Sequence, residues 1–159
     1  MRVARSLAII SVLAALAAGC SSSGPSFDEA ATELQRDVRR LETHDVFKNR
    51  LLQLRILQRA DKDIPCDQGK FRRVLRATAN EKRVDEPVDS HLDRAQRLME
   101  NVLAQDFGYR LVYDISQLDA EEGRFIYGKK EEFGLTVHAY VAPEPPTWRL
   151  YIMTDCLAR

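Results

Sequence analysis

The chain has 159 residues, of which 24 are Lys or Arg and 24 are Asp or Glu, so its formal net charge is zero. This balance argues against a nucleic-acid-binding protein, because such proteins carry a strongly basic surface. The length suits a single domain that is large enough to bury a hydrophobic core.

The N-terminus begins with two arginines, Arg2 and Arg5, which are followed by an apolar stretch at 7–18 and by small residues that end at Cys20. This order is typical of a secretory signal peptide. The apolar stretch is shorter than the roughly 20 residues that a helix needs to cross a bilayer. We therefore expect 1–19 to be a signal peptide; a buried apolar helix is the alternative.

Residues 16–20 read LAAGC and resemble the lipobox of bacterial lipoproteins, in which the cysteine sulfur receives a diacylglycerol and the chain is cut before that cysteine. Ala17 departs from the pattern, which more often has Leu, Val or Ile there. The resemblance implies a lipid on Cys20, a lipidated tether at 20–26, and anchoring to the extracytoplasmic face of the cell membrane. An ordinary cleaved signal peptide is the alternative.

Removal of residues 1–19 leaves 140 residues with 22 basic and 24 acidic side chains, a net charge of −2. If Cys20 carries lipid, Cys66 and Cys156 remain as an even pair in an oxidising compartment. We predict a disulfide between them. Two buried free thiols are the alternative.

The first half of the domain mixes helical and extended patterns. Apolar residues recur every three or four positions over 27–43, which predicts an amphipathic helix. The stretch 50–59 has a pattern compatible with helix or strand, and we assign a strand that forms a hairpin with a second strand at 71–80. Ser90 and Asp93 resemble a capping box that starts a second helix, which we expect to end near Gly108.

The second half alternates apolar and polar residues, which predicts strands at 109–116, 133–141 and 148–156, with a shorter strand at 124–128. The alternation places Cys156 on the core side of the last strand. We therefore expect a two-layer α+β domain over 27–159, in the order α-β-β-α-β-β-β. Its two helices cover one face of a largely antiparallel sheet.

Catalytic and metal-binding patterns are absent from the sequence, and we expect no enzyme activity, cofactor or metal. Each histidine (His44, His91, His138) is isolated from the others. The aspartates of one turn (Asp61, Asp63, Asp67) could bind calcium, but a solvated turn is favoured. The charged residues Glu121, Glu122, Lys129, Lys130, Glu131 and Glu132 are likewise interpreted as a solvated face.

Arginines at outward positions of the expected sheet form the one candidate binding site. They are Arg55, Arg72, Arg76, Arg110 and Arg149. Such a face could bind anionic phospholipid heads, a wall polymer or an acidic protein. The alternative is that the arginines only solvate the sheet. The tyrosines and Trp148 do not gather on one stretch of the sequence, so we do not expect an aromatic platform for sugars.

The layout, together with a cysteine in the closing segment TDCLAR, resembles small uncharacterised bacterial lipoproteins of the actinobacterial type. This resemblance implies a fold and a location and brings no catalytic residues. Our first hypothesis is a lipid-anchored, non-catalytic binding module. The second is a carrier of a small apolar ligand in a pocket lined by residues such as Met99, Val137 and Trp148. The third is a hydrolase with dispersed catalytic residues.

Overall fold

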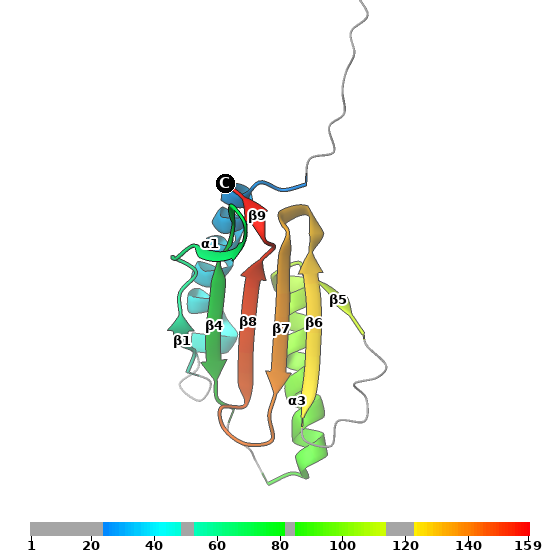
Figure 1. Ribbon diagram of the computed structural model, residues 1–159. Coiled ribbons are helices and arrows are strands. Elements are labelled where there is room, and N and C mark those ends of the chain that lie inside the picture. Colours follow the sequence, from blue (N-terminus) through cyan, green and yellow to red (C-terminus); the bar gives the residue numbers. More distant parts are fainter. Residues whose placement is uncertain (1–23, 49–52, 82–84, 114–122) are drawn as a thin grey trace, which may run out of the picture.

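The computed structural model describes residues 24–48, 53–81, 85–113 and 123–159, in which two long helices pack on one face of the main antiparallel sheet (Figure 1). The main sheet has six strands in the order β1-β4-β8-β7-β6-β5, and all neighbours are antiparallel. These strands are β1 (Arg55–Gln58), β4 (Val74–Ala79), β5 (Arg110–Val112), β6 (Arg124–Lys130), β7 (Leu135–Val141) and β8 (Trp148–Thr154). The expected two-layer α+β fold is confirmed.

Helix α1 (Phe27–Thr43) occupies the predicted range. A complete capping box starts it: the Ser26 hydroxyl accepts from the Glu29 backbone N–H, and the Glu29 carboxylate accepts from the Ser26 backbone N–H. These bonds satisfy backbone N–H groups that the first helical turn leaves without partners. A short helix, α2 (Asp45–Lys48), follows directly.

Helix α3 (Val88–Asn101) begins two residues before Ser90, so the predicted capping box at Ser90 is wrong. The Pro87 carbonyl already accepts the backbone N–H of His91, which starts the helix immediately after the proline. A π-helical turn, η1 (Val102–Asp106), continues it. Gly108 then adopts a φ of 76°, a conformation that favours glycine, as expected at this helix end.

The two early strands pair as predicted, although β1 begins only at Arg55 and residues 50–52 of the expected strand lie outside the described residues. The chain between them makes an additional hairpin. Strands β2 (Ile64–Asp67) and β3 (Lys70–Arg72) join β9 (Leu157–Ala158) in a small second sheet. The strand predicted at 71–80 is therefore divided between β3 and β4. The division falls at Arg73, whose backbone N–H donates to the Thr154 hydroxyl and whose carbonyl accepts from the Thr154 backbone N–H.

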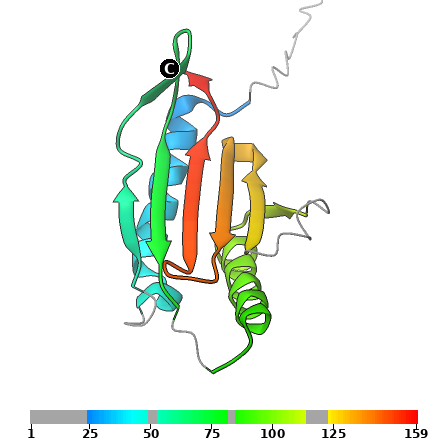
Figure 2. The same cartoon turned by 60° about the horizontal axis from the view of Figure 1, so that its bottom comes forward.

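A disulfide joins Cys66 on β2 to Cys156 across 90 residues, which confirms the predicted pairing. The last long strand ends at Thr154, so Cys156 lies in the link to β9 and is half-buried rather than on the core side of a strand. The bond connects the small sheet to the end of β8. The chain thus returns to its early hairpin at its C-terminus (Figure 2).

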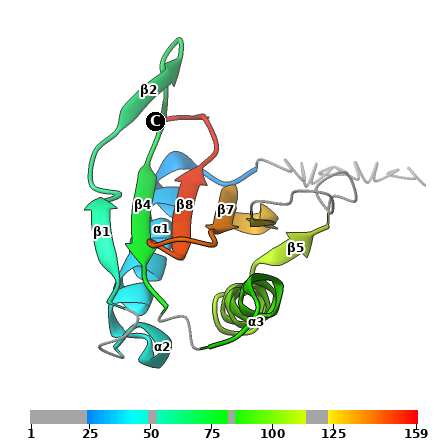
Figure 3. The same ribbon diagram turned by 90° about the horizontal axis from the view of Figure 1, so that it is seen from below.

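Helices α1 and α3 lie on the same side of the main sheet, as the view from below shows (Figure 3). Apolar residues from both helices and from the inward positions of four strands form one core cluster that includes Leu34, Leu92, Val137 and Ile152. This core, both sheets and the disulfide come from residues 24–159, so this segment contains what it needs to fold on its own. No helix within the described ranges is long and apolar enough to span a membrane.

Candidate functional site

The face of the main sheet that points away from α1 and α3 is the candidate site, and we call its outward residues the outer face. No helix from the described ranges lies over it (Figure 2), although two of its outward residues, Val74 and Thr136, are buried. Antiparallel register aligns these residues in rows across the strands. One row is Arg55, Thr78, Arg149, Tyr140 and Phe125. The next is Arg76, Tyr151, His138, Tyr127 and Val112. The third is Val74, Met153, Thr136, Lys129 and Arg110.

These three rows contain five basic residues and no acidic residue. Within the described ranges, no carboxylate forms an ion pair with Arg55, Arg76 or Arg149. Arg110 pairs with Glu131, which lies in the turn η3 (Glu131–Phe133) after β6. The outer face is therefore strongly positive, although the chain as a whole is neutral.

Each central tyrosine of the outer face has a cation over its ring. The Arg149 guanidinium lies 5.5 Å from the Tyr140 ring centre, and the Arg76 guanidinium lies 5.3 Å from that of Tyr151. The Lys129 ammonium lies 5.8 Å from the Tyr127 ring centre. These distances suit cation–π attraction, which holds the charged groups close to the sheet.

His138 occupies the middle of the second row. Its ring lies edge to face with Tyr127 at 4.8 Å and with Tyr151 at 6.3 Å between ring centres. Partial burial lowers the pKa of His138 below 6.5, because the surroundings disfavour the charged imidazolium. The positive charge of the outer face at neutral pH therefore comes from its arginines and lysine.

Four of the five predicted arginines lie on this face: Arg55, Arg76, Arg110 and Arg149. Arg72 instead lies on β3 of the small sheet, where it is half-buried with its Nη1 3.9 Å from the sulfur of Met153. Because the strand expected at 71–80 is interrupted at Arg73, Arg72 does not continue the alternation of β4 that would place it on the outer face. Arg72 stands beside the end of the third row.

The expectation that the tyrosines and Trp148 do not gather holds for Tyr109 and Trp148, which are buried, but it is wrong for the tyrosines of the outer face. Phe125, Tyr127, His138, Tyr140 and Tyr151 are neighbours on three adjacent strands. Each lies at an outward position of its strand, where outward residues alternate with inward apolar ones. This alternation is the sequence signal that identifies them. The pairing of three successive strands, β6, β7 and β8, brings them together.

A buried charged cluster lies on the opposite face, between α1 and β6. Lys130, which the sequence pattern assigned to a solvated face, is only 4% exposed, because it occupies an inward position of β6. Its ammonium donates to Glu33 at 3.0 Å and to both oxygens of Asp37 at 2.8 Å. Tyr109 donates its hydroxyl to Asp37 at 2.8 Å. Glu121 and Glu122 lie outside the described residues.

Burial raises the pKa of Asp37, and the hydrogen bonds from Lys130 and Tyr109 oppose that rise. Burial, followed by the charge of Asp37, raises the pKa of Tyr109 far above its ordinary value. The core excludes water from these groups, so we interpret the cluster as a structural connection between α1 and the sheet.

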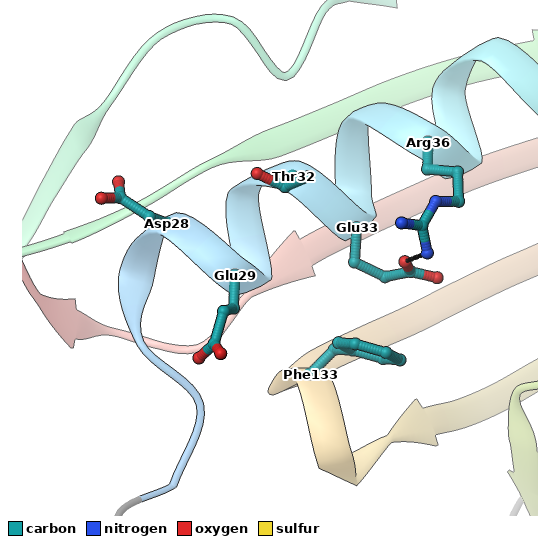
Figure 4. A pocket seen from close by; sticks show the side chains of 6 residues that line it. All are labelled: Asp28, Glu29, Thr32, Glu33, Arg36 and Phe133. Carbon is teal, nitrogen blue, oxygen red and sulfur yellow. Dashed lines mark hydrogen bonds and ion pairs between the residues drawn. The ribbon is translucent and has the colours of Figure 1, made fainter.

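A cavity of about 300 Å³ opens beside the first turns of α1 and is lined by Asp28, Glu29, Thr32, Glu33, Arg36 and Phe133 (Figure 4). Two of its three carboxylates have partners within the protein: Glu29 caps the helix, and Glu33 binds Lys130 and Arg36. The residues expected to line a carrier pocket, Met99, Val137 and Trp148, are instead buried in the core.

Four of the remaining candidates have partners within the fold. Asp63 pairs with Arg73 and Arg159, and Asp67 pairs with Lys70. His44 contacts Asp106, and His91 contacts Glu86. Across the described ranges, no three His, Cys, Asp or Glu side chains are grouped so that they could hold a metal ion.

Comparison of the chain with protein-family models, curated proteins and solved structures finds no match.

Proposed function

We propose that the protein is a lipid-anchored, extracytoplasmic binding module without catalytic activity, and that it binds an anionic partner through the outer face of its main sheet. The lipobox-like segment ending at Cys20 supports the anchor. One observation carries the binding proposal: the outer face holds five basic residues and no acidic residue in a chain whose charges balance.

Arginines elsewhere in the protein pair with acidic residues, and this contrast supports a binding role for the basic residues of the outer face. Arg94 pairs with Glu81 and Glu86, and Arg124 pairs with Asp93. The helical side thus intersperses both signs of charge, which is the usual composition of a solvated surface. Arg76 and Arg149 on the outer face contact tyrosine rings instead. Like charges on one face repel each other, and an anionic partner relieves that repulsion.

Binding to a soluble polyanion tests the proposal. Residues 24–159 are applied to immobilised heparin and eluted with increasing salt, because exposed charge pairs are screened as ionic strength rises. We expect the double variant Arg76→Gln/Arg149→Gln to elute at clearly lower salt than the wild type.

A matched variant controls for total charge. Arg39 and Arg97 are exposed on α1 and α3, so Arg39→Gln/Arg97→Gln removes the same two charges from the helical side. We expect it to elute close to the wild type. Equal shifts for the two double variants would show that heparin responds to net charge alone and would contradict the proposed binding face.

A further inference from the structure

We infer that the anionic partner is the surface of a phospholipid bilayer, and that the outer face lies against its headgroups. This inference rests on the proposed function and adds the chemistry of the partner. Three features of the outer face favour a bilayer over a soluble polyanion or an acidic protein. They are the exposed apolar side chains at its margin, the cations that cover its tyrosine rings, and its width.

Exposed apolar side chains mark the margin of the positive surface. Leu57, in a bulge of the edge strand β1, is 60% exposed, and Val112 on the opposite edge strand β5 is 43% exposed. Phe125, near the start of β6, is 51% exposed. A bilayer interface offers anionic phosphates together with an apolar layer beneath them, so it can contact both kinds of side chain. A soluble polyanion offers only the charge.

The tyrosine rings are not open for stacking. Arg149, Arg76 and Lys129 lie over the rings of Tyr140, Tyr151 and Tyr127. A sugar that stacks on aromatic faces would have to displace these cations. A headgroup layer can instead meet the cations where they stand, and amphipathic tyrosines are favoured at the boundary between polar and apolar surroundings.

The width of the outer face suits an extended planar partner. Its first row crosses the sheet from Arg55 on β1 to Phe125 on β6, and its second row reaches Val112 on β5. Basic residues lie near both edges, with Arg55 at one side and Arg110 at the other. A membrane surface can contact all of these positions at once.

Cosedimentation with vesicles tests the inference. Residues 24–159, which lack Cys20 and hence any lipid of their own, are mixed with vesicles of phosphatidylcholine alone or of phosphatidylcholine with phosphatidylglycerol. We expect binding to the phosphatidylglycerol vesicles only. Each basic residue near an anionic membrane contributes about fivefold to partitioning, so Arg76→Gln/Arg149→Gln should weaken binding roughly 25-fold. Arg39→Gln/Arg97→Gln should leave it nearly unchanged.

A second variant tests the apolar margin. Leu57→Ser/Phe125→Ser removes exposed apolar side chains without changing any charge, and we expect it to weaken vesicle binding roughly tenfold and heparin binding by much less. Thermal unfolding checks that each variant folds. Arginine-dependent heparin binding without vesicle binding would overturn this inference and leave the proposed function standing. Failure to bind either probe would overturn both. Vesicle binding that is insensitive to Leu57→Ser/Phe125→Ser would also overturn the bilayer assignment.

Discussion

Lys130 on β6 donates hydrogen bonds to both carboxylate oxygens of Asp37 on α1, each at 2.8 Å, inside the layer between helix and sheet. Neither side chain is accessible: Lys130 is 4% exposed and Asp37 is 0% exposed. The Tyr109 hydroxyl completes the surroundings of Asp37, and its ring lies 4.8 Å from the Lys130 ammonium. The first long helix is thus positioned on the sheet by a specific polar contact as well as by apolar packing.

Removing the ammonium should destabilise the domain strongly. Lys130→Met leaves Asp37 and Glu33 buried without their main cation, and we expect the free energy of unfolding to fall by about 3–5 kcal/mol. Urea denaturation measures the change. Lys129→Met, at the neighbouring outward position, should alter it by no more than about 0.5 kcal/mol. The double variant Lys130→Met/Asp37→Leu should recover part of the loss, and equal costs for both lysine variants would contradict the structural role.

The disulfide should contribute stability by restricting the unfolded chain. For a closed loop of 90 residues, the chain-entropy model gives up to about 4–5 kcal/mol. We expect Cys66→Ala/Cys156→Ala in residues 24–159 to lower the free energy of unfolding by up to that amount, as measured by urea denaturation. A thiol titration of the denatured, unreduced wild type should find no reactive group. Two reactive groups would contradict the pairing.

The lipid anchor is tested on the full chain in bacterial cells that are fed radioactive palmitate. We expect the wild type to be labelled and to fractionate with membranes. Cys20→Ala should lose the label, because the cysteine sulfur is the attachment point in the lipobox pattern. Cys66→Ala/Cys156→Ala controls for cysteine loss in general and should keep the label. Labelling of Cys20→Ala would contradict the lipobox interpretation.

Acid should weaken the start of α3. A hydrogen bond from Arg94, followed by the charge of Arg94 and a hydrogen bond from His91, lowers the pKa of Glu86 below 4.5 in the folded protein. The ionised form is therefore favoured by folding, and its contribution is present above about pH 4.5 and is lost as the pH falls through the folded-state pKa.

The loss is measured as the melting temperature between about pH 6 and pH 3. Glu86→Gln cannot ionise, so its melting temperature should start lower at pH 6 and should fall less steeply than that of the wild type. Glu29 behaves in the same direction, because hydrogen bonds from the Ser26 backbone and hydroxyl lower its pKa. Parallel curves for the wild type and Glu86→Gln would contradict the assignment to Glu86.

Several elements of the fold could be predicted because their patterns are local. The apolar spacing that includes Leu34 and Val38 identified α1, and the alternation around Leu150 and Ile152 identified the inward face of β8. The same alternation placed Arg149 on the outer face. The strand expected at 71–80 was wrong in its detail, because the break at Arg73 depends on hydrogen bonds to the distant Thr154.

The sequence by itself determined the two long helices, most strands, the pairing of Cys66 with Cys156 and the outward positions of four of the five arginines, because periodicity and cysteine number are properties of the chain alone. Only the tertiary structure decided the strand order and register that place Arg76 beside Tyr151 and gather aromatic residues from three strands. It also decided that Lys130 is buried. Such contacts join segments far apart in the chain, and their energies depend on burial and distance, which no local pattern contains.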